Sequence, residues 1–197
     1  MDGYHVALFL HIASLMAAGG ATSLTHFARL RRARSTTIRA AREWHGLLLV
    51  SARTFPYVLL VLLVSGGFMM SRQTGLSWRD GWVETGVLGI LLLGMFGGIL
   101  GKRGRAMADV LAAHEASTGA DAPPPPLRDA LAVKLSWMNL GIALGEVFVM
   151  TTKPALLPAL AAVAVGALAT IMVGRRLGGH SPVLHPAGAQ PAMPQPV

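Results

Sequence analysis

Residues 45–70 read HGLLLVSARTFPYVLLVLLVSGGFMM, and this stretch decides the fold. A bilayer core about 30 Å thick is crossed by about 20 apolar residues in a helix, and this run exceeds that length. Only Arg53 carries a permanent charge inside it. In hydrocarbon a helix is the default, because it bonds every backbone N–H and C=O within the segment. The stretch therefore predicts a transmembrane helix.

Four further apolar runs have a similar length, and they cover residues 4–27, 82–101, 130–151 and 155–173. The first has no basic residue before it and is too long for a signal peptide, so we expect it to be retained. Only Thr152, Lys153 and Pro154 separate the last two runs, which predicts a tight antiparallel pair. The expected fold is all-α, a polytopic membrane helical bundle over residues 4–174, with a four-helix core and a fifth C-terminal transmembrane helix. The Pro-, Ala- and Gly-rich residues 175–197 predict a disordered tail.

The composition agrees with a lipid-facing surface. Of 197 residues, 53% are hydrophobic and 13% charged, whereas soluble domains average about 25% charged residues. The absence of cysteine excludes disulfides, iron–sulfur clusters and thiolate metal sites. The net charge of +8 lies between apolar runs rather than along one face, which argues against a nucleic-acid partner and for the lipid bilayer.

The distribution of basic residues predicts the orientation. Most of the 17 lysines and arginines lie in the first and third connections and at the start of the tail. The other two connections hold only Arg72, Arg79 and Lys153. The positive-inside rule then places the N-terminus outside and the C-terminus in the cytoplasm of a bacterial inner membrane. Residues 107–116 are expected to extend the third helix as a short amphipathic segment.

Ionisable residues inside a membrane are functional candidates, because their burial is costly. From the outer side, His11 lies about 10 Å deep and Glu146 about 8 Å deep, at 1.5 Å per residue. Histidine binds haem iron and metals, and methionine suits copper(I). One hypothesis is therefore a cofactor site at His11 and Glu146, with a metal set of His11, Met69, Met70 and Met150. The alternative is that Glu146 is bonded within the bundle and the methionines fill gaps.

A second candidate cluster lies toward the inner side. His26 ends the first apolar run, His45 begins the second, and Arg53 follows about two turns later. Two histidines on adjacent helices are a pattern that brackets haem, and an arginine binds a propionate or a lipid phosphate. The alternative is that both histidines face the headgroups while Arg53 extends its side chain to the membrane surface.

Glycines at intervals of four recur at Gly97 with Gly101 and at Gly141 with Gly145. Such pairs let helix backbones approach closely in lipid. Packing within the bundle and formation of a homodimer both fit this pattern, and we favour internal packing.

Three segments carry a family resemblance: FLHIASLMAAGG at 9–20, RTFPYVLLVLLVSGGFMM at 53–70 and VFVMTTKP at 147–154. With the arginine-rich first connection, they resemble a family of bacterial integral membrane proteins related to copper-resistance protein D and to the HemJ-type protoporphyrinogen oxidases. The resemblance covers roughly residues 5–154 and implies a four-helix core. In those oxidases a first-helix histidine and a membrane lysine are associated with haem and catalysis. His11 matches that histidine by position, but residues 82–101 contain no lysine.

Three functions are carried forward. The first is a non-enzymatic subunit or accessory factor of a membrane complex, with membrane-protein partners or a homodimer and no catalytic residue. The second is a membrane protein that binds haem b or copper. The third, ranked lowest, is a HemJ-like oxidoreductase.

Overall fold

The computed structural model describes residues 2–72, 75–126 and 129–178, and these residues form helices and short connections with no strand. The five helices are α1 Gly3–Ala33, α2 Ile38–Arg72, α3 Gly81–Thr118, α4 Ala130–Thr152 and α5 Leu156–Gly178. Each is long and apolar enough to cross a membrane. The predicted all-α bundle of five apolar helices is confirmed.

Four helices run past the ends of their apolar segments. α1 continues to Ala33, α2 begins at Ile38 and α3 ends at Thr118, which confirms the predicted helical extension over 107–116. Arginine and alanine are good helix formers, so these helices continue beyond the apolar residues. At the other end of the chain α5 ends at Gly178. The first residues of the predicted tail are thus helical, and its remainder lies outside the described residues.

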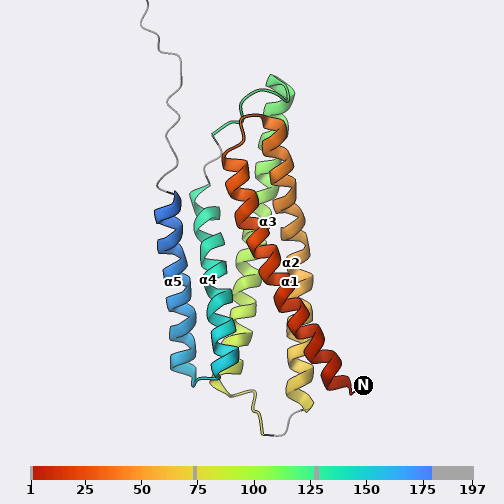
Figure 1. Cartoon of the computed structure of the whole chain (residues 1–197), viewed down its shortest axis with the longest axis vertical. Coiled ribbons are helices and arrows are strands. Elements are labelled where there is room, and N and C mark those ends of the chain that lie inside the picture. Colours follow the sequence, from red (N-terminus) through yellow and green to blue (C-terminus); the bar gives the residue numbers. More distant parts are fainter. Residues whose placement is uncertain (1, 73–74, 127–128, 179–197) are drawn as a thin grey trace, which may run out of the picture.

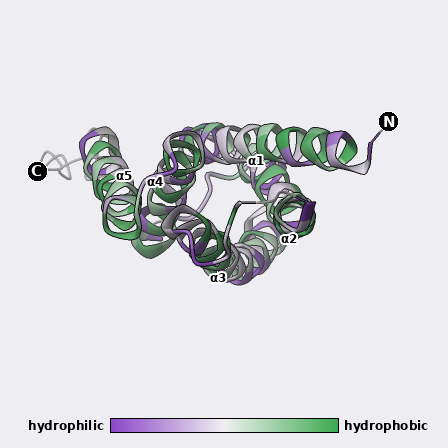
Figure 2. Ribbon diagram, turned by 90° about the horizontal axis from the view of Figure 1, so that it is seen from below, coloured by the Kyte–Doolittle hydropathy of each residue, from purple (hydrophilic) through white to green (hydrophobic). Residues whose placement is uncertain are grey.

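The helices run side by side and alternate in direction (Figure 1). Viewed along their length, α1 to α4 surround a common axis, and α5 lies outside this group beside α4 (Figure 2). The contacts agree, because α5 packs on α4 and, less extensively, on α3. The α1–α2 and α3–α4 connections lie at the same end of the bundle. We call this end the arginine-rich end, after residues 29–42 and 102–105.

Backbone and side-chain bonds join the two connections at the arginine-rich end. The N–H of Ile38 donates to the Ala122 carbonyl at 2.9 Å, and the N–H of Arg39 to that of Ala120 at 3.0 Å. Arg42 forms an ion pair with Glu115 of α3. The start of α2 is therefore fixed against the end of α3 and the loop that follows it.

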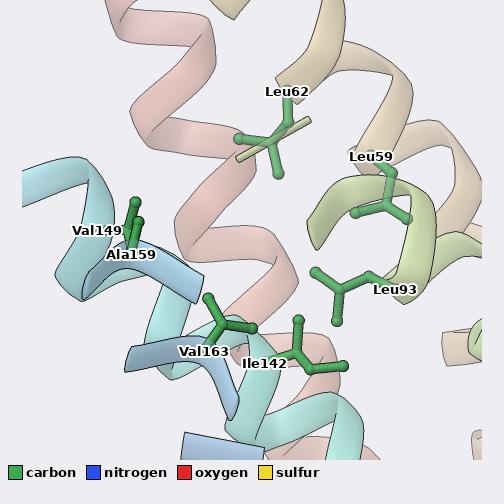
Figure 3. Packing of buried hydrophobic residues seen from close by; sticks show 7 residues of the cluster. All are labelled: Leu59, Leu62, Leu93, Ile142, Val149, Ala159 and Val163. Carbon is green, nitrogen blue, oxygen red and sulfur yellow. The ribbon is translucent and has the colours of Figure 1, made fainter. Parts of the chain in front are cut away.

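Apolar side chains fill the interior and also cover the outside. One cluster of buried apolar residues consists of Leu59, Leu62, Leu93, Ile142, Val149, Ala159 and Val163 (Figure 3). On the outer surface, Met16 is 73% exposed and Leu157 80% exposed. Apolar exposure of this extent is unfavourable in water but favourable against lipid tails.

Close backbone contact fixes α5 against α4. A Cβ atom added at Gly141 would overlap the Gly166 carbonyl of α5, and one at Gly145 would lie 2.6 Å from Val163 Cα. The Thr170 hydroxyl donates to the Trp137 carbonyl at 2.7 Å. This glycine pair therefore serves packing within the chain, as favoured from the sequence.

Candidate functional site

A cavity of about 100 Å³ lies among α1, α2, α3 and α4 toward the arginine-rich end. Its polar and charged lining comes from all four helices and from the residue that precedes α4: Thr22, Thr25, Arg29, Arg32, His45, Ser51, Arg103, Asp129, Ser136 and Asn139. Leu48, Phe55 and Leu100 are among its apolar lining residues.

Three arginines make this cavity electropositive. Arg29 and Arg32 come from successive turns of α1, and Arg103 comes from α3. Arg103 Nη1 donates to both carboxylate oxygens of Asp129, at 3.0 and 3.1 Å. Asp129 is the only acidic residue among the described residues of the lining. Among the described residues, the guanidinium groups of Arg29 and Arg32 therefore have no carboxylate with which to form an ion pair.

Asp129 has a structural role at the start of α4. Its carboxylate accepts a bond from the Ala132 N–H at 2.9 Å, so it caps the helix. Burial of the carboxyl acts to raise its pKa, but the bonds from Ala132 and Arg103 and the charge of Arg29 hold the pKa below its ordinary value. Asp129 is therefore ionised at neutral pH and is already engaged by its own partners.

His45 is buried at 3% exposure, and both ring nitrogens have partners. Nδ1 accepts from Arg32 Nη1 at 2.8 Å, and Nε2 donates to the Gly104 carbonyl at 2.8 Å. Arginine offers no acceptor, so Nδ1 carries no proton. This histidine positions Arg32 and has no nitrogen left for a metal. One interpretation of the sequence had His45 facing the headgroups. The side chain is instead buried between helices.

Two polar atoms of the residues that line this cavity have no hydrogen-bond partner among the described residues. Arg29 Nε is a buried donor, and Asn139 Oδ1 is a buried acceptor. Buried polar atoms are nearly always hydrogen-bonded, to protein, water or ligand. A ligand with a hydrogen-bond acceptor near Arg29 would satisfy the free Nε donor.

The other two residues of the predicted inner cluster lie elsewhere. The His26 ring packs on Trp137 of α4, with 4.5 Å between ring centroids, and His26 is not among the cavity-lining residues. Its Nε2 is buried without a partner in the described part of the chain. Arg53 is exposed on α2 and lines neither cavity. The structure therefore brings only His45 of the three into this cavity.

The sequence did not point to four charged residues of this cavity as site residues, because they were assigned to connections between helices: Arg29, Arg32, Arg103 and Asp129. One signal was present. Thr22, Thr25, Arg29 and Arg32 follow each other at intervals of three, four and three, which places them on one face of a continuous helix. Once the helix is known to reach Ala33, that face predicts an inward polar stripe.

The predicted outer cluster is divided between two parts of the bundle. His11 Nδ1 lies 3.2 Å from the Leu62 carbonyl and 3.1 Å from Ser65 Oγ, both on α2. Glu146 instead contacts Gly86 and Gly89 of α3. These contacts place the two side chains against different neighbouring helices.

The predicted methionine ligands are likewise spread out. Met69 and Met70 are half-buried near the end of α2, whereas Met150 packs on Gly86 of α3. In the parts of the chain that the structure describes, no three His, Asp or Glu side chains are placed to hold a metal ion.

Glu146 lines a second cavity, of about 290 Å³, between α3, α4 and α5. Its side chain is buried, at 9% exposure. Neither carboxyl oxygen has a hydrogen-bond partner among the described residues. The interpretation that Glu146 is bonded within the bundle therefore finds no support in these contacts.

Comparison with known proteins adds no constraint. No family model, no curated protein and no solved structure matches this chain.

Proposed function

We propose that this chain is a non-enzymatic protein of a bacterial inner membrane that binds the phosphate of an anionic lipid headgroup at its arginine-rich end. The N-terminus lies outside and the arginine-rich end faces the cytoplasm. With this lipid bound, the chain acts as a subunit or accessory factor of a membrane complex. One observation carries the proposal: Arg29 and Arg32 line a cavity in which Asp129, the single carboxylate among the described lining residues, is already bonded to Arg103.

Charge and geometry both support a phosphate ligand. Guanidinium groups bind phosphate through charge-assisted hydrogen bonds and are favoured over ammonium groups at partly buried sites. The bond from Arg32 to His45 fixes one guanidinium in advance. The cavity of about 100 Å³ admits a small headgroup while the acyl chains remain in the surrounding leaflet.

The test is co-purification of lipid. Wild-type protein is extracted from membranes, exchanged into nanodiscs that contain phosphatidylglycerol and phosphatidylcholine, and the lipid retained after a second detergent extraction is quantified by native mass spectrometry. We expect retained phosphatidylglycerol in the wild type and its loss in Arg29→Gln. The matched control is Arg53→Gln, which removes an exposed arginine from a neighbouring helix. Equal retention by Arg29→Gln would contradict the proposal. Release of the lipid by inorganic phosphate alone would point to a free anion as the ligand.

Haem binding is the second candidate function, and one observation favours it. His26 Nε2 is buried without a partner among the described residues, one turn before Arg29. Two observations fit haem less well. The void of about 100 Å³ is below the roughly 300–1,000 Å³ of most small-molecule sites, and His45 has both nitrogens engaged. A visible spectrum of the purified protein without a Soret band would exclude this candidate, and with it a HemJ-like activity.

A further inference from the structure

The second cavity is a groove with apolar walls and one carboxyl group. It has a volume of about 290 Å³ and is formed by α3, α4 and α5. Among the described residues that line it, Glu146 is the only ionisable one and Phe96 is the only aromatic one. The remaining lining residues are aliphatic side chains, Met138, Thr85 and Gly89. The site is separate from the arginine cavity and shares no lining residue with it.

The α3 helix is shaped to accept the Glu146 carboxyl. A Cβ atom added at Gly89 would overlap that carboxyl, and one at Gly86 would lie 3.6 Å from Oε2. Any larger residue at position 89 would exclude the side chain in its present position. Glu146 is more than nine-tenths buried, at 9% exposure, and lines the groove.

No partner in the described residues compensates this carboxyl group. Both oxygens lack a hydrogen bond, and no ion pair of the described residues includes Glu146. Lys153 lies two turns further along α4, and its Nζ is 5.2 Å from the centre of the Trp82 ring. A carboxylate buried among apolar side chains is strongly destabilised unless it takes up a proton or pairs with a cation.

The lining distinguishes between kinds of cation. A metal ion requires several oxygen, nitrogen or sulfur ligands, and the described residues provide no group of three His, Asp or Glu for one. A single carboxylate among aliphatic groups and one aromatic ring suits an organic cation, whose substituents are apolar and whose charge is attracted to both the carboxylate and the ring. At the rim, Leu88 is 44% exposed and Ala164 is exposed, so the groove opens sideways between α3 and α5.

We propose that the α3–α5 groove binds a lipophilic organic cation, which enters from the lipid, pairs its charge with Glu146 and packs its apolar groups against α3 and α5. The inference does not depend on the proposed lipid-headgroup site. The two sites can be tested separately in the same preparation.

The experiment measures binding of radiolabelled tetraphenylphosphonium to full-length protein in phosphatidylcholine nanodiscs. Saturable binding above that of empty nanodiscs is expected for the wild type. Glu146→Gln keeps the size of the side chain and removes its charge, and it should weaken binding roughly tenfold or more, which corresponds to the loss of one charge pair. Glu84→Gln is the matched control. It removes an exposed carboxylate from the first turn of α3, close in sequence to the glycines on which Glu146 packs. It should leave binding unchanged.

Two further measurements keep the test decisive. Tetraphenylborate has the same shape and the opposite charge, so it should not bind saturably. Ala164→Phe fills the rim of the groove without changing Glu146, and it should also abolish tetraphenylphosphonium binding. Ala164→Phe provides the test of the groove if Glu146→Gln fails to fold. The proposal is overturned by absence of saturable tetraphenylphosphonium binding, by equal binding of tetraphenylborate, or by full binding in a folded Glu146→Gln or Ala164→Phe protein.

Discussion

Arg32 Nη1 donates to His45 Nδ1 across 2.8 Å, and this bond joins the end of α1 to the start of α2. The same imidazole donates to the Gly104 carbonyl of α3. One neutral histidine therefore connects three helices and holds a guanidinium at the cavity. Its two bonds form only when all three helices are in register, so His45 reports on the assembly of the arginine-rich end.

Replacement of His45 by alanine is expected to lower both stability and lipid retention. Each lost hydrogen bond contributes about 0.5–1.5 kcal/mol, and the partly buried Gly104 carbonyl loses its side-chain donor. The midpoint of thermal unfolding in detergent, followed by circular dichroism, should fall, and retained phosphatidylglycerol should decrease because Arg32 is no longer fixed. The exposed His5→Ala is the control. An unchanged midpoint in His45→Ala would show that the bridge does not stabilise the fold.

Acid should weaken the arginine-rich end through Asp129. Its folded pKa lies below the ordinary value of 3.8, so its contribution to stability is present above that value and is lost as the pH falls through the folded pKa. Asp129→Asn removes this dependence. Between about pH 5 and pH 3, the unfolding midpoint of the wild type should fall more than that of Asp129→Asn. Asp109→Asn, at an exposed position of α3, should behave as the wild type does.

The sequence predicted the transmembrane architecture because length and hydropathy alone determine which segments cross lipid. The arginine site escaped prediction for a related reason. Arg29 and Arg32 lie beyond the apolar run and were assigned to a loop, yet α1 continues through both residues. Hydropathy marks where a helix leaves the hydrocarbon but not where the helix ends. The chain turns after Ala33, where the N–H of Arg34 donates to the Arg31 carbonyl and the N–H of Ser35 donates to the Arg32 carbonyl, both at 3.1 Å.

The outer cluster shows a second limit of sequence reasoning. The depth of His11 and Glu146 follows from their distance to a helix end, and the two depths match. Which neighbour each side chain faces depends on the rotation of α1 and α4 and on the order of the helices around the bundle. Those are properties of the packed structure: His11 bonds to α2, and Glu146 packs on α3.

Gly89 should be intolerant of even a methyl group. In Gly89→Ala the new Cβ would overlap the Glu146 carboxyl, and overpacking of this kind costs about 1–3 kcal/mol. The double variant Gly89→Ala with Glu146→Ala removes the overlap and should recover part of that loss in a double-mutant cycle. Gly98→Ala is the control in the same helix, because nothing lies within 4 Å of its added Cβ. Additive effects of the two substitutions would argue against the close contact.

The proposed orientation is open to a direct test because the chain has no cysteine. Single cysteines are introduced at Arg34, after α1, and at Ser77, before α3, and both positions are exposed. The basic residues of the arginine-rich end resist transfer across the membrane, so a membrane-impermeant maleimide should label Ser77→Cys in intact cells and Arg34→Cys only after permeabilisation. Labelling in the reverse pattern would invert the topology. It would also place the arginine cavity, and its lipid partner, in the opposite leaflet.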